Sequence, residues 1–238
     1  MQKRFYSNGK LLITSEYLVL DGATALALPT KFGQDLVVEQ THHRSIDWTS
    51  FDADGSIWLQ AVFSLDEIAS GETLSSEPTF LRLLSILHQA HLMNPTLLEN
   101  SSGFRIQTHL SFPRFWGLGS SSTLINNVAQ WFGIDAYELL HKTFGGSGYD
   151  IACAQNDSAI LYQRKENKPF VQAIEFKPEC AQNIYFVYLN QKQDSRKAIE
   201  SYRANGWSNN ELISTFNQLT QDIVLKNDFE SLMQTIRA

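Results

Sequence analysis

A glycine-rich run followed by three hydroxyl side chains is the part of this sequence best suited to chemistry. Gly117-Leu118-Gly119 leads into three serines, and the apolar spacing from Ser121 to Phe132 predicts a helix that begins at this junction. Glycines let backbone amides turn toward a ligand, and the free N–H groups at a helix N-terminus favour an anion. Hydroxyls in the first turn can also bind phosphate oxygens or a magnesium ion. The structural alternative is a glycine-rich turn capped by Ser120.

Two other segments place charged side chains beside glycines. Residues 7–22 read SNGKLLITSEYLVLDG, in which Lys10 precedes an apolar run, and a lysine that enters a buried strand is expected to have a partner. Residues 145–152 read GGSGYDIA, in which Asp150 follows a flexible turn that can project it into a cleft. The alternatives are a solvated lysine and an aspartate that caps a helix.

The three segments together, in this order, resemble the motifs of the GHMP kinase superfamily, named for galactokinase, homoserine kinase, mevalonate kinase and phosphomevalonate kinase. Residues 7–22 are similar to the family's opening motif, and residues 145–152 to its Pro-Ser-Gly-x-Asp motif, with Gly146 where proline is usual. The resemblance implies an ATP-dependent small-molecule kinase, with ATP and Mg²⁺ as cofactors.

The resemblance also implies roles for individual residues. It makes Asp150 the catalytic carboxylate and Lys10 its partner, because a cation holds a carboxylate ionised beside an acceptor hydroxyl. It assigns nucleotide binding to Gly117, Leu118, Gly119, Ser120, Ser121 and Ser122. It assigns magnesium to Ser121 and Glu138, and the substrate to Glu16, Tyr17, Ser147, Ser195 and Lys197. Glu138 stands one residue further from Asp150 than in the mevalonate kinase pattern, so the alternative is that Glu138 is a solvated glutamate on a helix. For Ser195 and Lys197 the alternative is that they are surface residues at the start of a helix.

The acceptor class follows from the first motif. Glu16-Tyr17 is closer to the Gly-Glu-Tyr version seen in phosphomevalonate kinases than to the Gly-Glu-His of mevalonate kinases, and the sugar-binding signature of galactokinases is absent. The resemblance therefore implies a mevalonate-pathway acceptor, mevalonate or phosphomevalonate.

Two departures from the family pattern leave a second function open. Phe115 replaces a small residue before the glycines. Its side chain either keeps the backbone away from phosphate or packs outward. Gly206 is the only glycine after Val187, so the family's third glycine-rich motif is missing; we expect a longer protein, because half a lobe would expose apolar surface. The alternative function is a degenerate member that binds a metabolite or nucleotide without kinase activity. The presence of Lys10, Ser121 and Asp150 together favours the enzyme.

The spacing of apolar residues predicts an α+β protein. We expect strand-rich segments at 5–20 and 25–40, a hairpin at 46–48 and 57–63, and strands at 104–110, 158–162, 171–176 and 184–189. We also expect a helix capped by Thr79 and a helix from Asp135 toward Phe144. The chain after Asp194 is predicted to be helical, with a capping box of Ser208 and Glu211. The resemblance implies two lobes: a ribosomal protein S5 domain 2-like lobe at residues 1–178 that binds nucleotide, and an incomplete ferredoxin-like lobe at residues 179–238.

Composition limits the partners. The chain has 238 residues, 43% of them apolar, and a net charge of −6 with both signs interleaved, which disfavours nucleic acid. Cys153 and Cys180 make no disulfide framework, and no apolar run is long enough to cross a membrane. We expect a cytoplasmic protein that acts on a small molecule, without nucleic-acid or membrane partners, and with a homodimer as the assembly to consider.

Overall fold

A seven-stranded sheet forms the framework of the protein. The computed structural model describes residues 2–166, 168–188, 195–206, 209–226 and 228–237, with the side chains of 195–197 left out. All strand pairs are antiparallel except β3 with β5. The strand order is β4 (Ile57–Ser64), β3 (Ser45–Phe51), β5 (Phe104–Leu110), β2 (Ala25–Gln40), β6 (Ile160–Lys165) and β7 (Lys168–Ala173), and β1 (Gln2–Leu12) pairs with β2.

The long strand β2 joins the two halves of the sheet. Its first residues pair with β6, its last residues pair with β5, and β1 runs along nearly all of it. The pairing of β1 is irregular between Asn8 and Lys10. A side chain on Gly9 would lie 2.6 Å from Thr30 Oγ1 and 2.8 Å from the carbonyl oxygen of Leu118. Glycine is therefore required here, because the chain around Leu118 packs directly on the irregular part of β1.

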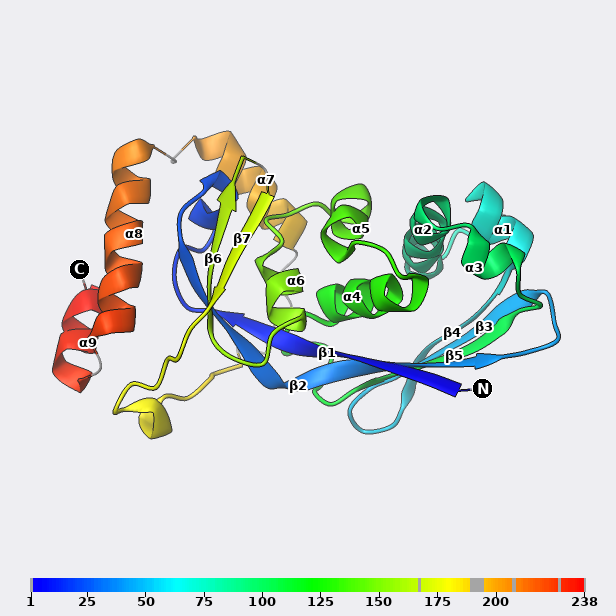
Figure 1. Ribbon diagram of the computed structural model, residues 1–238, viewed down its shortest axis with the longest axis horizontal. Coiled ribbons are helices and arrows are strands. Elements are labelled where there is room, and N and C mark those ends of the chain that lie inside the picture. The colour runs from blue at the N-terminus through cyan, green and yellow to red at the C-terminus, as the bar shows by residue number, and fades with distance from the viewer. Residues whose placement is uncertain (1, 167, 189–194, 207–208, 227, 238) are drawn as a thin grey trace.

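The helices between β4 and β6 in the chain cover one side of this sheet (Figure 1). Trp48, Phe63, Ile106, Ile125 and Phe132 are buried in the largest core cluster, between sheet and helices. These helices are α1 (Leu65–Ser70), α2 (Pro78–Met93), α3 (Thr96–Glu99), α4 (Ser120–Phe132), α5 (Ala136–Thr143) and α6 (Tyr149–Ala154).

The elements predicted from the strongest apolar periodicity are confirmed, and the predicted start of one helix is corrected. The strand at 104–110, the hairpin of β3 with β4 and the helix capped by Asp135 form as predicted. Thr79 is wrong as a cap: Glu77 caps α2 by accepting a hydrogen bond from the N–H of Phe80 at 2.6 Å, and Pro78 is its first residue. Proline suits that position because its missing N–H would have no partner there.

The later strands differ from their predicted positions. The strands predicted at 158–162 and 171–176 form as β6 and β7, each displaced toward the turn between them. The strand predicted at 184–189 is wrong over 184–188, because these residues pair with no strand in the described part of the chain; residue 189 lies outside it. Ile184 to Val187 are exposed, so apolar character alone was misleading.

The C-terminal helices pack on the loop that follows β1. They are α7 (Ser195–Asn205), α8 (Asn210–Leu225) and α9 (Phe229–Arg237). Thr220 of α8 donates a hydrogen bond to Thr14 Oγ1 at 2.8 Å, and Asn217 accepts one from the N–H of Thr24 at 2.6 Å. Asn209 caps α8, whereas Ser208 of the predicted capping box lies outside the described residues. The described residues of 179–238 hold no strand, so a ferredoxin-like lobe and the boundary at 178 stay predictions.

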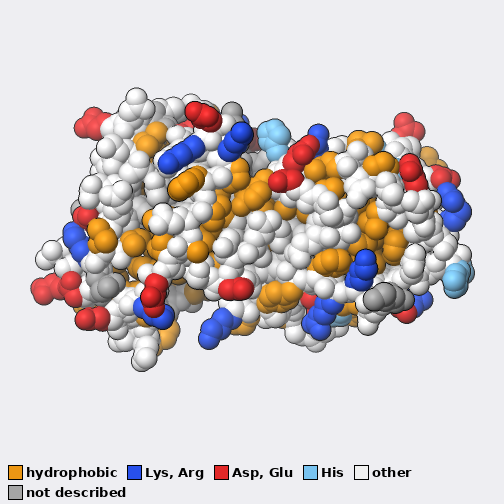
Figure 2. All heavy atoms as spheres, in the orientation of Figure 1, with side chains coloured by type: hydrophobic (Ala, Val, Ile, Leu, Met, Phe, Trp, Pro, Cys, Tyr) orange, Lys and Arg blue, Asp and Glu red, His pale blue; other side chains and the backbone are white. Residues whose placement is uncertain are grey.

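On the face seen in Figure 2, lysines and arginines alternate with aspartates and glutamates around its rim, and hydrophobic side chains appear between them. Among the described residues, no helix is both long and apolar enough to cross a membrane.

Candidate active site

The glycine turn, residues 117–119, immediately precedes helix α4, whose first backbone N–H groups are unpaired within the described part of the chain. Gly117 and Gly119 have φ angles of 78° and 90°, which favour glycine. Gly119 occupies the N-cap position and no side chain caps the helix, so the alternative of a turn capped by Ser120 is wrong. The N–H groups of Ser120, Ser121 and Ser122 have no acceptor among the described residues. Three unpaired donors at the positive end of a thirteen-residue helix make this junction suitable for an anion.

The two bulky residues before the glycine turn differ in their surroundings, because Phe115 is exposed whereas Trp116 packs against the cluster that includes Leu118. Phe115 is 46% exposed, and the guanidinium of Arg114 lies 4.6 Å from the centre of its ring. Trp116 packs edge-on against Phe32 with 5.9 Å between ring centres. Of the two alternatives for Phe115, the structure thus has the outward one, and the glycine turn is left open.

Lys10 is brought to the glycine turn by β1. Its N–H donates to the carbonyl oxygen of Leu118 at 2.9 Å. A side chain on Gly119 would lie only 3.0 Å from Lys10 Cγ, so the lysine stem runs directly beside this glycine. The ammonium lies 5.4 Å from the centre of the Tyr149 ring. Lys10 is therefore held between the start of α4 and the start of α6, and is not a free surface lysine.

Asp150 is the carboxylate of this site. The N-cap of α6 is Gly148, with φ 91°, so the alternative in which Asp150 caps a helix is wrong. Burial raises the pKa of Asp150, while the charge of Lys10 and hydrogen bonds from the backbone N–H groups of Asp150 and Ile151 oppose that rise. The site thus holds a carboxylate whose basicity is increased by burial, together with a cation that stabilises its charge.

The same carboxylate affects its neighbours. Burial raises the pKa of Cys153 to about 12, and the charge of Asp150 adds to that shift. A thiol with so high a pKa is protonated at neutral pH, so Cys153 is no nucleophile. Ser122, which the sequence grouped with the nucleotide-binding serines, is instead buried, donates to the carbonyl oxygen of Gly119 at 2.8 Å and also affects Asp150.

The predicted substrate residues of the first motif lie beside Tyr149. Burial raises the pKa of Tyr149, and the charges of Asp150 and Glu16 add to that shift, so all three are near one another. Tyr17 has a φ of 61° and stacks on Tyr202 of α7 with 5.5 Å between ring centres. This contact connects the first motif to the C-terminal helices and could not be foreseen, because it joins residues far apart in sequence.

The other predicted residues are less closely connected to the site. The carbonyl oxygen of Ser147 accepts a hydrogen bond from the Tyr162 hydroxyl. Ser195 and Lys197 lie in the first turn of α7, and their side chains are outside the description. Glu138 is exposed on α5, 3.6 Å from Lys142 Nζ.

Of the two residues predicted to bind magnesium, only Ser121 has a side chain without a partner among the described residues. Ser121 is exposed in the first turn of α4, and its hydroxyl has no hydrogen-bond partner in the described part of the chain. The described residues contain no cluster of three His, Cys, Asp or Glu side chains that could hold a metal. Magnesium usually takes one or two protein ligands besides phosphate and water, so Ser121 suits it, whereas Glu138 would first have to leave Lys142.

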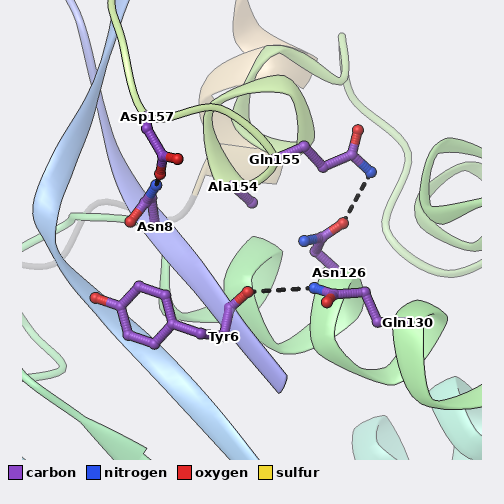
Figure 3. A pocket seen from close by; sticks show the side chains of 7 residues that line it. All are labelled: Tyr6, Asn8, Asn126, Gln130, Ala154, Gln155 and Asp157. Carbon is purple, nitrogen blue, oxygen red and sulfur yellow. Dashed lines mark hydrogen bonds between the residues drawn. The ribbon is translucent and has the colours of Figure 1, made fainter. Parts of the chain in front are cut away.

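A polar groove lies at the other end of α6, and hydrogen bonds among its residues join the elements that carry the site (Figure 3). Gln155 donates to Asn126 Oδ1 at 2.9 Å, and Asn126 donates to the buried Ser7 hydroxyl at 2.8 Å. Asn8 donates to Asp157 Oδ1 at 2.9 Å. These bonds join α6, α4 and β1, the three elements that carry Asp150, the serines and Lys10. Sequence reasoning missed them, because isolated carboxamides carry no spacing signal.

The fold is shared with solved kinase structures. The chain aligns over 99% of its length with 76% of a mevalonate kinase from Methanococcus jannaschii, at 14% identity and a TM-score of 0.65. It aligns equally far with 78% of a phosphomevalonate kinase from Streptococcus pneumoniae in complex with phosphomevalonate and AMPPNP, at 14% identity and 0.65. It also aligns over 99% with 74% of a heptose 1-phosphate kinase from Bacteriodes thetaiotaomicron, at 16% identity and 0.61. No protein-family model matches the sequence, and no curated protein is significantly similar to it. The chain has the α+β fold of the GHMP kinases.

Proposed function

We propose that this chain, which has the GHMP kinase fold, is an ATP-dependent kinase of that superfamily that phosphorylates a small molecule. The observation that carries the proposal is the meeting of Lys10, the glycine turn and Asp150 at the start of α4. Three motifs that are far apart in the sequence converge on one anion-binding helix start. The solved structures with this fold include kinases for three different acceptors.

The proposed mechanism uses positioning and charge, because phosphoryl transfer needs little covalent chemistry from the protein. The free N–H groups of residues 120–122 bind the phosphates of ATP. The Ser121 hydroxyl would hold Mg²⁺, which would neutralise charge on the transferred phosphoryl group. Asp150 lies at the reacting oxygen of the acceptor and accepts its proton where that oxygen belongs to a hydroxyl, as in mevalonate. Lys10 keeps Asp150 ionised and orients the reacting oxygen, whether it belongs to a hydroxyl or to a phosphate.

We propose a mevalonate-pathway acceptor, mevalonate or phosphomevalonate, bound between the first motif and the 145–148 turn. Glu16 and Tyr17 lie near Tyr149 and Asp150, which supports an acceptor site beside the carboxylate. Ser147 is proposed to line that site from the 145–148 turn, and Ser195 and Lys197 from the start of α7. The neighbours include both a mevalonate and a phosphomevalonate kinase, and also a sugar-phosphate kinase, so the acceptor panel below includes sugars.

The cytoplasm is the proposed site of the reaction, where ATP is available and where the two free cysteines, Cys153 and Cys180, stay reduced.

The experiment is an acceptor screen with a separate test of nucleotide binding. Mevalonate, phosphomevalonate, homoserine, galactose and a heptose phosphate are each offered with ATP and Mg²⁺, and ADP release is measured. Melting temperature is measured in parallel with ATP, with and without Mg²⁺. Turnover with mevalonate or phosphomevalonate supports the whole proposal, and turnover with a sugar alone overturns the acceptor class. Nucleotide binding without any turnover would support the alternative of a binding protein, and neither response would overturn both.

A further inference from the structure

A second cavity, of about 230 Å³, lies between α5, the 145–148 turn and the β6–β7 hairpin. Tyr137 and His141 line it from α5, Ser147 from the turn, and Tyr162 and Arg164 from β6. Sites for drug-sized ligands are about 300–1,000 Å³, so this cavity suits a single small group. Neither Lys10 nor Asp150 lines it.

Arg164 is the cation of this cavity. Its side chain is partly exposed, and the guanidinium makes no hydrogen bond, ion pair or ring contact with any residue the structure describes, although its positive charge opposes the rise in the pKa of Tyr162. A guanidinium has five N–H donors and is always charged at physiological pH. These donors are therefore available to an anion that enters the cavity.

Several other groups around the cavity are donors that have no acceptor among the described residues. The hydroxyls of Tyr137 and Ser147 donate to no described residue, and the same is true of the N–H groups of Gly146, Ser147 and Gly148. No aspartate or glutamate lines the cavity. A cavity lining with unpaired hydrogen-bond donors, one permanent positive charge and no negative charge is complementary to an anion.

We propose that this cavity binds an oxyanion, a phosphate or carboxylate group, with Arg164 as the main ligand and Tyr137, Ser147 and His141 as further donors. The charge of Asp150 acts on both Tyr137 and Tyr162, so the anion sits within electrostatic reach of that carboxylate. Arg164 is the cation that offsets this repulsion. The anion has two sources with the same chemistry: a free anion, or the anionic end of the acceptor. Only the second rests on the proposed function.

The test uses inorganic phosphate and isothermal titration in a buffer of constant ionic strength. Wild-type protein binds phosphate saturably. Arg164→Gln binds it roughly tenfold to hundredfold more weakly, because a charged hydrogen-bond partner is lost. Lys142→Gln, which removes an exposed cation on the same helix α5, leaves the affinity unchanged. Lys10→Met, which changes the glycine-turn site, leaves a phosphate site of wild-type affinity.

Two results overturn the proposal: no saturable phosphate site in the wild type, or a site that Lys10→Met removes and Arg164→Gln retains. The second result would place the anion at the glycine turn. Melting temperatures without phosphate show whether Arg164→Gln folds. If it does not, Tyr137→Phe removes a single oxygen from the lining, and its phosphate affinity falls several-fold if the cavity is the site.

Steady-state kinetics then separate the two sources of the anion. If the cavity holds the anionic end of the acceptor, phosphate competes with the acceptor and Arg164→Gln raises KM with little change in kcat. If it holds a free anion, phosphate changes kcat without competing. A protein that binds phosphate at Arg164 but has no kinase activity retains the cavity and loses only the proposed function.

Discussion

The backbone N–H of Lys10 donates to the carbonyl oxygen of Leu118 across 2.9 Å, which fixes β1 to the glycine turn. The bond forms because Gly9 lets the two backbones approach. Through it, the position of the lysine side chain and the shape of the proposed phosphate site depend on each other.

Gly119→Ala should reduce ATP affinity by tenfold or more. An alanine there must adopt a φ near 90°, and its methyl group would lie 2.8 Å from Ser122 Oγ and 3.0 Å from Lys10 Cγ. Gly133→Ala is the control, because Gly133 ends the same helix at φ 67° with open space around it. Both variants should lose about 1 kcal/mol of stability from backbone strain, whereas only Gly119→Ala should affect ATP binding. Equal ATP affinities in titration would contradict the role of the glycine turn.

Ser121→Ala should weaken binding of Mg²⁺–ATP more than binding of metal-free ATP. The exposed hydroxyl is proposed to bind the ion, and its loss removes no internal hydrogen bond. Titration of ATP with Mg²⁺ and with EDTA measures both affinities. An equal reduction under both conditions would leave Ser121 without a metal-binding role.

Asp150→Asn should lower kcat by about 10²–10⁴, because it removes a general base while retaining size and hydrogen-bonding capacity. Since Gly148 is the N-cap of α6, the loss would not come from an unfolded helix end. Circular dichroism and steady-state kinetics on the same preparation measure the two effects. Wild-type turnover in this variant would refute the mechanism.

The stability of the wild type should fall as pH rises through the folded-state pKa of Asp150. Burial raises that pKa above its ordinary value, so the folded protein holds the proton over a pH range in which the unfolded chain has lost it. Stability is therefore greatest below this range and is reduced above it. Asp150→Asn cannot ionise, so its melting temperature should exceed that of the wild type above this range and match it below. A constant difference at all pH values would argue against this titration.

Asn126→Ala should destabilise the protein by about 1–3 kcal/mol, because it removes a buried donor to the Ser7 hydroxyl and leaves the side-chain amide of Gln155 without its acceptor. Gln130→Ala, one turn later, removes a longer and exposed bond of the same groove, from Gln130 to the carbonyl oxygen of Tyr6 at 3.3 Å, and should cost less than about 0.5 kcal/mol. Urea denaturation measures both. Similar values for the two variants would mean that the buried bonds of Asn126 hold α4 to β1 no better than the exposed bond of Gln130 does.

The sequence by itself determined the elements whose side chains alternate or recur strongly. Strand 104–110 buries one face, and burial of one face imposes an alternation that can be recognised locally. The helix from 120 to 132 is buried on nearly all sides, and its apolar residues still recur at helical spacing. The three motifs were also recognisable, since residue types and short spacings carry them.

Only the tertiary structure decided which of these residues meet. Lys10 and Asp150 come together through the register of β1 on β2 and the close packing at Gly9, neither of which leaves a periodic signal. The outward turn of Phe115 depends on Arg114 and Asp52, and the stacking of Tyr17 on Tyr202 depends on where α7 packs. The apolar residues 184–187 lacked a strand partner, because pairing depends on a second strand that local sequence does not supply.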